Sequence, residues 1–132
     1  MTIFVDTSAI YAFLDADDDG HSAVLNEWQR ATDARDVLVT SNYVLAESIA
    51  LSQNRGGIGM LRDLVARVAP AMRVEWIGQD VHEVGLAALL LANRRDLSLV
   101  DCTSFELMRR LGLTCAFALD PHFREQGFEV VP

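Results

Sequence analysis

The sequence predicts an α/β fold in which a mostly parallel sheet of about five strands lies between two layers of helices. Short runs of β-branched and aromatic residues, which are typical of strands, alternate with longer segments of helical periodicity. Strands and helices that alternate in this way form a parallel sheet covered on both faces. The chain has 132 residues, of which 51% are hydrophobic, so we expect residues 1–132 to form one domain with its own core.

Five segments are expected to be strands. The first, residues 2–5, is β-branched and aromatic and stops at Asp6. The third, residues 73–77, alternates between polar and apolar side chains, and the last two are short. The predicted strands are residues 2–5, 37–40, 73–77, 115–119 and 128–131.

The segments between these strands are expected to be helices. The predicted helices are residues 9–14, 21–35, 42 to a break at Gly56 and Gly57, 60–68, 81–94 and 101–111. Pro70 stops the fourth helix, and Gly112 ends the last one. Residues 81–94 are rich in Ala and Leu and apolar nearly all round, so we expect this helix to be well buried or at an interface.

The composition limits the classes of function. The net charge of −8 argues against a general nucleic-acid coating protein, although clustered carboxylates that bind cations would make an enzyme acidic too. All 11 basic residues are arginine, which suits bidentate contacts with phosphate. No apolar run approaches the ~20 residues of a membrane span, and no signal peptide is evident, so we expect a cytoplasmic protein with no membrane partner. There, Cys102 and Cys115 would remain thiols.

Four acidic residues share a pattern of placement. Asp6 and Asp120 each directly follow a predicted strand, and Asp101 begins a helix. Glu47 lies on a mostly apolar helix at the edge of the buried stripe, where a charge is costly unless it has a partner or a cation. The carboxyl ends of parallel strands meet at one edge of a sheet, which is where open α/β folds bind their ligands.

Each of these carboxylates also has a purely structural interpretation. Asp6 and Asp120 can cap the helices that follow them, and Ser98 with Asp101 fits a capping box with Asp in the place of Glu. Glu47 can pair with an arginine. Taken singly, the structural interpretation is favoured for three of them and nearly even for Glu47. Acidic residues at all four positions favour a common function.

Converging carboxylates would repel one another. Two charges ~4 Å apart cost about 1 kcal/mol in water and ~4 kcal/mol at a surface-like dielectric. A hard divalent cation removes this cost, and oxygen ligands without His or Cys select Mg²⁺ or Mn²⁺ over Zn²⁺. Carboxylate-held divalent ions can activate water and stabilise a departing oxygen in phosphodiester cleavage.

Together, these segments resemble the PIN domain family, and most closely the VapC-type ribonuclease toxins of bacterial toxin–antitoxin pairs. The resemblance covers essentially the whole chain, and four motifs in order make it specific. The motifs are Phe4-Val5-Asp6-Thr7-Ser8, Tyr43-Val44-Leu45-Ala46-Glu47, Leu97 to Phe105, and Leu119-Asp120-Pro121-His122-Phe123 followed by Gly127-Phe128. The fold that it implies is a three-layer α/β/α PIN-like domain.

The resemblance implies the residues of the active site. Its catalytic and metal-binding set would be Asp6, Glu47, Asp101 and Asp120. Thr7 or Ser8 would orient Asp6 or a metal-bound water. The family hydrolyses RNA phosphodiester bonds with Mg²⁺ or Mn²⁺ and forms no covalent intermediate.

The resemblance also implies partners. Members usually form homodimers and are silenced by an antitoxin from the adjacent gene. The antitoxin's C-terminal segment lies in or near the active groove and often offers an arginine to the carboxylates. This chain departs from many relatives at Val100, where they have Thr, so a hydroxyl near the third carboxylate is missing.

Other signals favour structural roles. Residues 15–20 match the first half of an EF-hand loop, but the twelfth position is Asn26, so a solvated acidic turn that caps the next helix is favoured. Surface or capping roles are expected for the three isolated histidines, His21, His82 and His122. Core or interface roles are expected for the two tryptophans, Trp28 and Trp76. Four arginines lie at predicted helix C-termini, where contacts with RNA or antitoxin stay open: Arg94, Arg95, Arg109 and Arg110.

Three functions compete with a toxin. One is a PIN-like binding module with weak or no turnover, and another is a housekeeping RNA-processing nuclease without an antitoxin. A third is a phosphatase or phosphotransfer domain with Asp6 as nucleophile. The last is disfavoured because Ser8 stands where the second Asp of such phosphatases would be.

Overall fold

The computed structural model describes all 132 residues and contains one five-stranded sheet. Its strands are β1 (Thr2–Val5), β2 (Val37–Ser41), β3 (Arg73–Glu75), β4 (Cys115–Phe117) and β5 (Glu129–Val131). Their order across the sheet is β3-β2-β1-β4-β5, and every neighbouring pair is parallel. The predicted α/β class with a parallel sheet is therefore confirmed.

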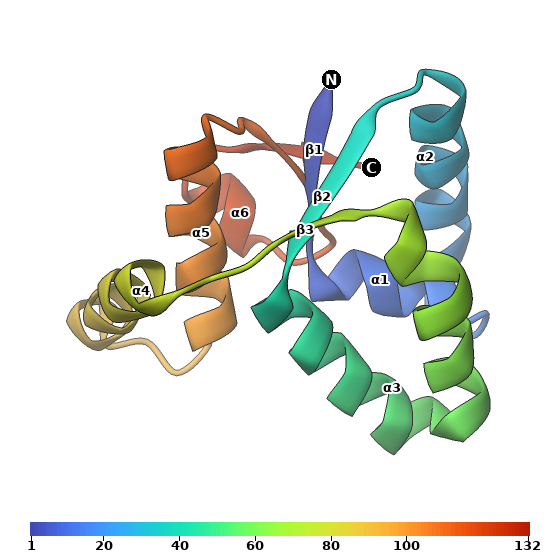
Figure 1. The fold of residues 1–132 in the computed structure, drawn as a ribbon, viewed down its shortest axis with the longest axis horizontal. Helices are drawn as coiled ribbons and strands as arrows, with labels where there is room; N and C mark the ends of the chain where they lie inside the picture. The colour runs from blue at the N-terminus through green and yellow to red at the C-terminus, as the bar shows by residue number, and fades with distance from the viewer.

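Helices cover both faces of this sheet (Figure 1). They are α1 (Thr7–Leu14), α2 (His21–Asp33), α3 (Asn42–Asp63), α4 (Gln79–Ala92), α5 (Leu99–Leu111) and α6 (His122–Glu125). The chain moves from β1 to β3 in one direction and then returns to β4 and β5 on the other side of β1. Because such crossovers are right-handed, α1–α3 lie on one face and α4–α6 on the other. The strand order thus reverses between β1 and β4.

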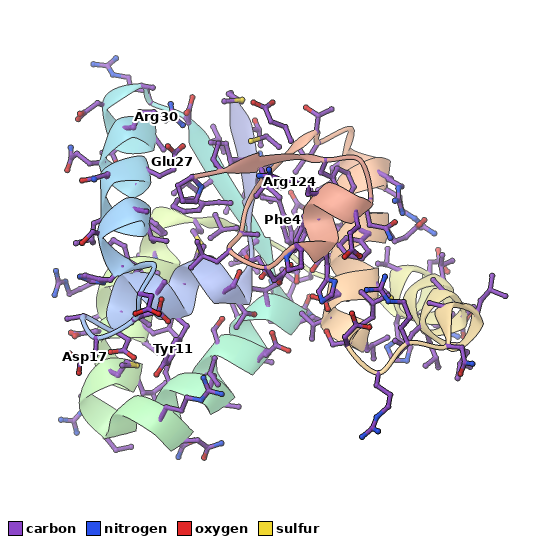
Figure 2. The ribbon with its side chains drawn as sticks, turned by 180° about the vertical axis from the view of Figure 1, so that it is seen from behind. Phe4, Tyr11, Asp17, Glu27, Arg30 and Arg124 are labelled. Carbon is purple, nitrogen blue, oxygen red and sulfur yellow. The ribbon has the colours of Figure 1, made fainter.

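The core is aromatic and centred on β1 and β4. Phe4, Phe117 and Phe123 are fully buried, and Phe4 lies in the middle of the molecule in Figure 2. The Phe123 ring centroid lies 6.3 Å from that of Phe4 and 5.0 Å from that of Phe105, which joins α6 and α5 to the sheet. Glu27 and Arg30 of α2, which are also labelled, form an ion pair on the side of the helix that faces the strands. This aromatic packing thus fixes β1 and β4 relative to α5 and α6.

Several predicted boundaries shift for local reasons. The first helix begins at Thr7 rather than Ala9, because the Asp6 side chain caps it through the Ser8 N–H. The strands β3 and β4 end two residues earlier than predicted, at Glu75 and Phe117. Trp76, which then follows β3, is 78% exposed and does not anchor the core. Trp28 does, since its ring centroid lies 4.6 Å from that of Phe13.

The long helix α3 contains the predicted break. Gly57 has φ 78° and ψ −171°, a conformation that residues other than glycine rarely adopt, and the helix resumes beyond it. A π-helical turn (Leu64–Val68) and a 3₁₀ turn (Ala69–Ala71) then lead into β3. Residues 42–56 therefore form one regular helical segment that starts at the edge of the sheet.

The helix α4 is not buried as its composition suggested. Leu90 and Leu91 are 72% and 88% exposed, and Val84 and Leu86 are partly exposed as well. The helix packs on α5 through Gly85, where a Cβ atom would lie 2.5 Å from Thr103 Cγ2. The expectation that this helix is buried is therefore wrong for the single chain. The alternative, that it lies at an interface with a partner, stays a prediction. None of the helices combines the length and apolarity needed to cross a membrane.

Candidate metal centre and active site

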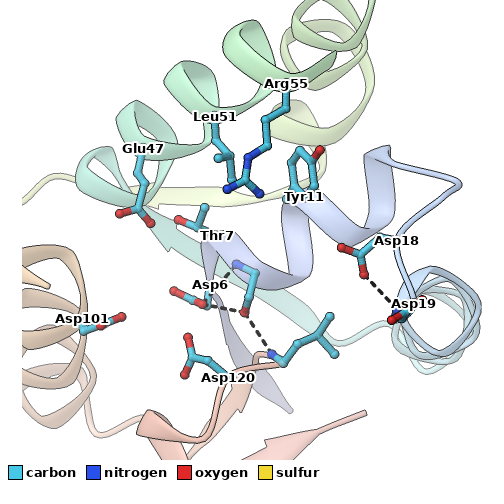
Figure 3. Close-up of a pocket in the computed structure, with 13 residues that line it drawn as sticks. Asp6, Thr7, Tyr11, Asp18, Asp19, Glu47, Leu51, Arg55, Asp101 and Asp120 are labelled. Atoms are coloured by element: carbon cyan, nitrogen blue, oxygen red, sulfur yellow. Dashed lines mark hydrogen bonds between the residues drawn. The ribbon is translucent and has the colours of Figure 1, made fainter. Parts of the chain in front are cut away.

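A pocket of about 810 Å³ opens at the carboxyl end of β1 and β4, where the strand order reverses (Figure 3). Open α/β sheets bind ligands at this kind of switch point. The lining residues are Asp6, Thr7, Ser8, Tyr11, Asp18, Asp19, Gly20, Glu47, Leu51, Arg55, Asp101, Leu119 and Asp120. Six of these 13 carry carboxylates and one is basic, so the pocket is strongly acidic.

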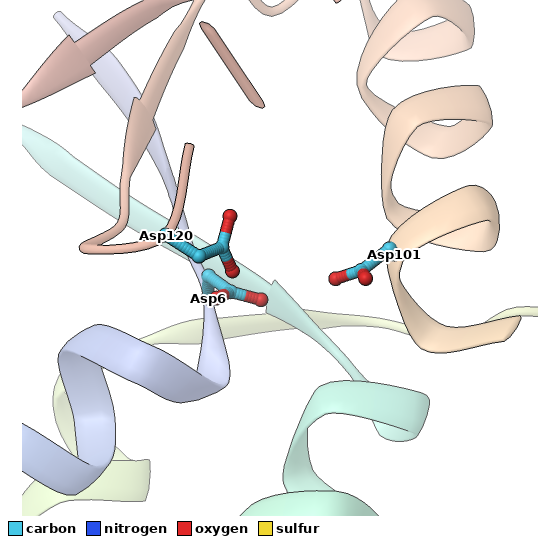
Figure 4. Close-up of side chains that lie close together, drawn as sticks. All are labelled: Asp6, Asp101 and Asp120. Atoms are coloured by element: carbon cyan, nitrogen blue, oxygen red, sulfur yellow. The ribbon is translucent and has the colours of Figure 1, made fainter. Parts of the chain in front are cut away.

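Three of the predicted carboxylates meet in this pocket (Figure 4). Asp6 follows β1, Asp120 lies in the loop after β4, and Asp101 lies in the first turn of α5. One carboxylate oxygen from each lies within 4.8 Å of the others. Asp6 is 3% exposed, whereas the other two are partly buried. The parallel sheet and the start of α5 thus bring together residues that are distant in sequence.

Ser8 fixes the side chain of Asp6. Asp6 Oδ2 accepts hydrogen bonds from the Ser8 backbone N–H at 3.1 Å and from Ser8 Oγ at 2.7 Å. Ser8 Oγ in turn accepts from the Leu119 backbone N–H at 2.9 Å. The same hydroxyl therefore holds Asp6 and ties the loop that carries Asp120 to the start of α1.

The other two aspartates are also held by backbone groups. Asp101 Oδ2 accepts from the Ser98 N–H at 3.1 Å, and Ser98 Oγ accepts from the Asp101 N–H, which completes the predicted capping box. Asp120 Oδ1 accepts from the His122 N–H at 3.0 Å. In all three aspartates one oxygen is held by the protein and the other has no hydrogen-bond donor. The capping roles therefore orient the carboxylates and leave one oxygen of each available to a ligand.

The cluster is electrostatically strained without a cation. Burial, with smaller contributions from the charges of Asp120 and Asp101, raises the pKa of Asp6 to about 7 against the lowering effect of the Ser8 hydrogen bonds. Burial also raises the pKa of Asp101, with a further contribution from Asp120. A bound cation would favour the ionised form of both groups and so oppose this effect.

The donor set fits a hard divalent cation. The three ligand atoms are carboxylate oxygens, with no His or Cys in the group, and this selects ions such as Mg²⁺ or Mn²⁺. Thr7 Oγ1 also lines the pocket, is buried, and has no hydrogen-bond partner within the protein. An unpaired buried hydroxyl needs a polar partner, which the water shell of such an ion would provide.

Glu47 lies in the same pocket but outside the three-aspartate group. It is partly buried on α3, and in Figure 3 its carboxylate points into the pocket from the side opposite Asp120. It forms neither a hydrogen bond nor an ion pair, so the structural alternative of an arginine partner is wrong. The structure gathers three members of the predicted quartet closely and places the fourth across the pocket from Asp120.

Sequence reasoning missed part of the pocket lining. Leu51 and Arg55 lie one and two turns after Glu47 on the same helix, a spacing that could have identified them. Tyr11 of α1 and residues 18–20 of the acidic turn also reach the pocket. That turn does not cap α2 as expected, because Asp18 Oδ1 accepts from the Gly20 N–H instead.

The arginines left open by the sequence lie away from this pocket. Arg94 forms ion pairs with Asp96 and Glu125, and Arg110 forms one with Glu106. Arg109 lies over the Phe128 ring at 5.4 Å from its centroid. The lining of the acidic pocket includes none of them, and Arg95 is absent from it as well.

Comparisons with known proteins agree with the geometry. The PIN domain family model matches residues 3–129. The 23S rRNA-specific endonuclease VapC20 of Mycobacterium tuberculosis is 36% identical over 132 residues, which cover 98% of each chain. The crystal structure of that protein, described as a sarcin–ricin loop cleaving toxin, superposes with a TM-score of 0.85, 35% identity and coverage of 98% of this chain and 99% of that one.

A more distant structure shares the fold alone. FitAcB from Neisseria gonorrhoeae superposes with a TM-score of 0.68 at 15% identity, covering 100% of this chain and 97% of that chain. The four motifs, the parallel sheet and the family match therefore agree. This chain belongs to the PIN domain family, among its VapC-type endonucleases.

Proposed function

We propose that this VapC-type endonuclease cleaves a structured loop of ribosomal RNA, using a divalent cation held by Asp6, Asp101 and Asp120. The observation that carries the proposal is the approach of the three carboxylates to within 4.8 Å at the switch point of the sheet. Such an arrangement is costly for folding alone and is suited to metal-assisted hydrolysis. The alternative of a phosphatase receives no support, since the residue after Thr7 is Ser8, which is engaged in holding Asp6.

The substrate class is inferred from a full-length relative. The mycobacterial protein that is 36% identical over 98% of both chains is specific for 23S rRNA, and its structure is described as that of a toxin cleaving the sarcin–ricin loop. Because identity at this level covers nearly the whole chain, we propose ribosomal RNA as the substrate class of this protein too.

The roles of the site residues follow from their surroundings. When bound, Mg²⁺ or Mn²⁺ would polarise the phosphodiester and neutralise the charge that develops in its cleavage. Asp6, Asp101 and Asp120 would hold the ion through the oxygens that the protein leaves without a donor. Ser8 keeps Asp6 in place, and Thr7 Oγ1 offers an unused hydroxyl at the same wall.

Glu47 is assigned to the same catalytic set. Its carboxylate faces the pocket from α3 without a protein partner. A carboxylate in that position can accept a proton from the attacking water, which would reach the phosphodiester from the open side of the pocket. The loss of Glu47 should therefore reduce the rate of cleavage more than it reduces the affinity for the cation.

We also propose a homodimer and an antitoxin as protein partners in the cytoplasm. The exposed leucines of α4 would be covered in the homodimer, since apolar surface of this kind favours association. The acidic pocket would accept the arginine of an antitoxin segment, as the family resemblance implies. An adjacent gene that encodes a small antitoxin would support this partner, and its absence would favour the housekeeping nuclease.

The experiment is a cleavage assay on a hairpin RNA with the sequence of the sarcin–ricin loop. Wild-type protein with Mn²⁺ should cut the hairpin at a defined position, and EDTA should stop the reaction. Asp6→Asn should be inactive while retaining its fold by circular dichroism. If the wild type binds the hairpin and intact ribosomes without cutting either, the chain is a binding module and the proposed function is wrong.

A further inference from the structure

A row of three side chains on α3 runs along one wall of the acidic pocket. Glu47, Leu51 and Arg55 are spaced by four residues, so they lie on one face of the helix, and all three line the pocket (Figure 3). The helix is regular here because its kink comes only at Gly57. Eight residues of helix rise about 12 Å, so Arg55 lies well away from Glu47 along the same wall.

Arg55 is the one basic residue among the 13 that line the pocket. It forms no ion pair, although Asp18 and Asp19 lie in the same lining and five of the other ten arginines pair with acids. A guanidinium that is exposed and unpaired within an acidic pocket is free to bind an anion from solution.

Tyr11 holds this guanidinium in a defined place. Arg55 Cζ lies 5.6 Å from the centroid of the Tyr11 ring, within the range of a cation–π contact. In Figure 3 the guanidinium lies between the Tyr11 ring and the Leu51 side chain and points into the pocket. A guanidinium placed over a ring keeps the N–H groups at its edge available for a planar anion, which suits a phosphate bound through two hydrogen bonds.

We propose that Arg55, supported by Tyr11, binds a backbone phosphate of the RNA beside the one that is cleaved. The inference rests on the proposed function, because it names the contact that brings RNA into that site. A chain with net charge −8 has little general attraction for RNA, so the one basic side chain in the pocket should contribute a large share of the affinity for RNA. Because Arg55 lies on the pocket wall beyond Glu47, the phosphate that it binds would lie away from the three-aspartate group.

The test measures RNA binding apart from cleavage. Fluorescence anisotropy with a labelled sarcin–ricin hairpin is recorded in the inactive Asp6→Asn background over a range of salt concentrations. Arg55→Gln should weaken binding roughly tenfold and lower the slope of log affinity against log salt by about 0.7 to 0.9. Arg55→Lys should keep the slope and recover part of the affinity, because it retains the charge but loses the planar fork.

Arg62→Gln is the matched control. Arg62 lies on the same helix, is exposed, and does not line the pocket, so its removal makes the same change in net charge. It should leave affinity, salt slope and cleavage unchanged. In the otherwise wild-type enzyme, Arg55→Gln should raise KM more than it lowers kcat. Mn²⁺ affinity, measured by titration calorimetry, should not fall, because the substitution removes a positive charge.

The outcomes separate this inference from the proposed function. If wild-type protein cleaves the hairpin but Arg55→Gln and Arg62→Gln bind RNA alike, the phosphate subsite is wrong and the proposed function stands. A loss of Mn²⁺ affinity in Arg55→Gln would also overturn the subsite, since Arg55 would then support the metal centre. If wild-type protein cleaves no RNA but the Arg55 variant alone loses binding, the proposed function fails and the subsite survives.

Discussion

At the scale of single residues, each of the three aspartates combines a structural role with the proposed metal-binding role. Asp6 caps α1, Asp101 completes the capping box of α5, and Asp120 receives the N–H of His122. Judged from the sequence alone, capping and metal binding are alternatives for these residues. The structure makes them compatible, because capping uses one oxygen of each carboxylate and fixes the direction of the other. Backbone N–H groups, together with the Ser8 hydroxyl, thus hold the three carboxylates in place.

Removal of the Asp6 charge should separate stability from activity. Asp6→Asn keeps an oxygen that can accept from Ser8 and removes a buried charge that faces Asp120. The metal-free variant should therefore unfold at a higher Tm than metal-free wild type at pH 8, as measured by differential scanning calorimetry. Mn²⁺ should raise the Tm of the wild type and leave the variant nearly unchanged. A wild type with no Mn²⁺-dependent shift would show that the carboxylates form no metal site.

The raised pKa of Asp6 also predicts a pH dependence of metal-free stability. The folded state keeps this proton up to a pH of about 7, whereas the unfolded state loses it near 3.8. Between these values the folded state binds more protons, so the free energy of unfolding should fall as pH rises from about 4 to 7, by on the order of 4 kcal/mol. Urea unfolding at a series of pH values measures this fall. Asp6→Asn should show a much flatter profile, and an equally steep profile in the variant would assign the effect elsewhere.

At the scale of elements, the contact between α4 and α5 depends on one glycine. A Cβ at Gly85 would lie 2.5 Å from Thr103 Cγ2 and 3.1 Å from the Thr103 backbone nitrogen. Thr103 cannot retreat easily, because it is fully buried and its hydroxyl donates to the Leu99 carbonyl. Since Thr103 lies half a turn from Asp101, this packing also fixes the start of α5 and its carboxylate.

We therefore expect Gly85→Ala to destabilise the protein by roughly 1–3 kcal/mol through overpacking. Gly59→Ala on α3 is the control, because nothing lies within 4 Å of the added Cβ and alanine favours helix by up to about 1 kcal/mol. Urea denaturation of both variants measures the difference. If Gly85→Ala is as stable as the control, α4 is free to shift and does not fix the position of Asp101.

The elements also show how far the sequence could predict this site. Asp6 and Asp120 could be placed together because the ends of parallel strands share an edge of the sheet, and the Ser98–Asp101 capping box could be recognised from four residues. The separation of Glu47 from the three aspartates could not be predicted from the sequence, because it depends on the angle at which α3 leaves the sheet. Arg55 could have been found, because its spacing of eight residues from Glu47 places both side chains on one face of the helix.

At the scale of the whole molecule, two surfaces have no partner within the chain: the acidic pocket and the exposed apolar face of α4. The composition of α4 is the same whether it is buried inside one chain or between two, so sequence alone could not decide between these possibilities. The structure excludes burial of α4 inside one chain, because Leu90 and Leu91 are 72% and 88% exposed. A homodimer formed through α4 would cover this face and leave the pocket, which opens at the switch point, to RNA and antitoxin.

This proposal predicts that charges on α4 prevent dimer formation. Leu90→Glu combined with Leu91→Glu should give a monomer by analytical ultracentrifugation under conditions where wild type is a dimer, because burial of two carboxylates would oppose association. Val65→Glu is the control, since Val65 is also exposed, at 57%, but lies in the π-helical turn after α3. The double variant should keep Mn²⁺ binding, because α4 supplies no residue of the pocket lining. If it remains a dimer, α4 is not the dimer interface, and its apolar face must be covered by another partner or remain exposed.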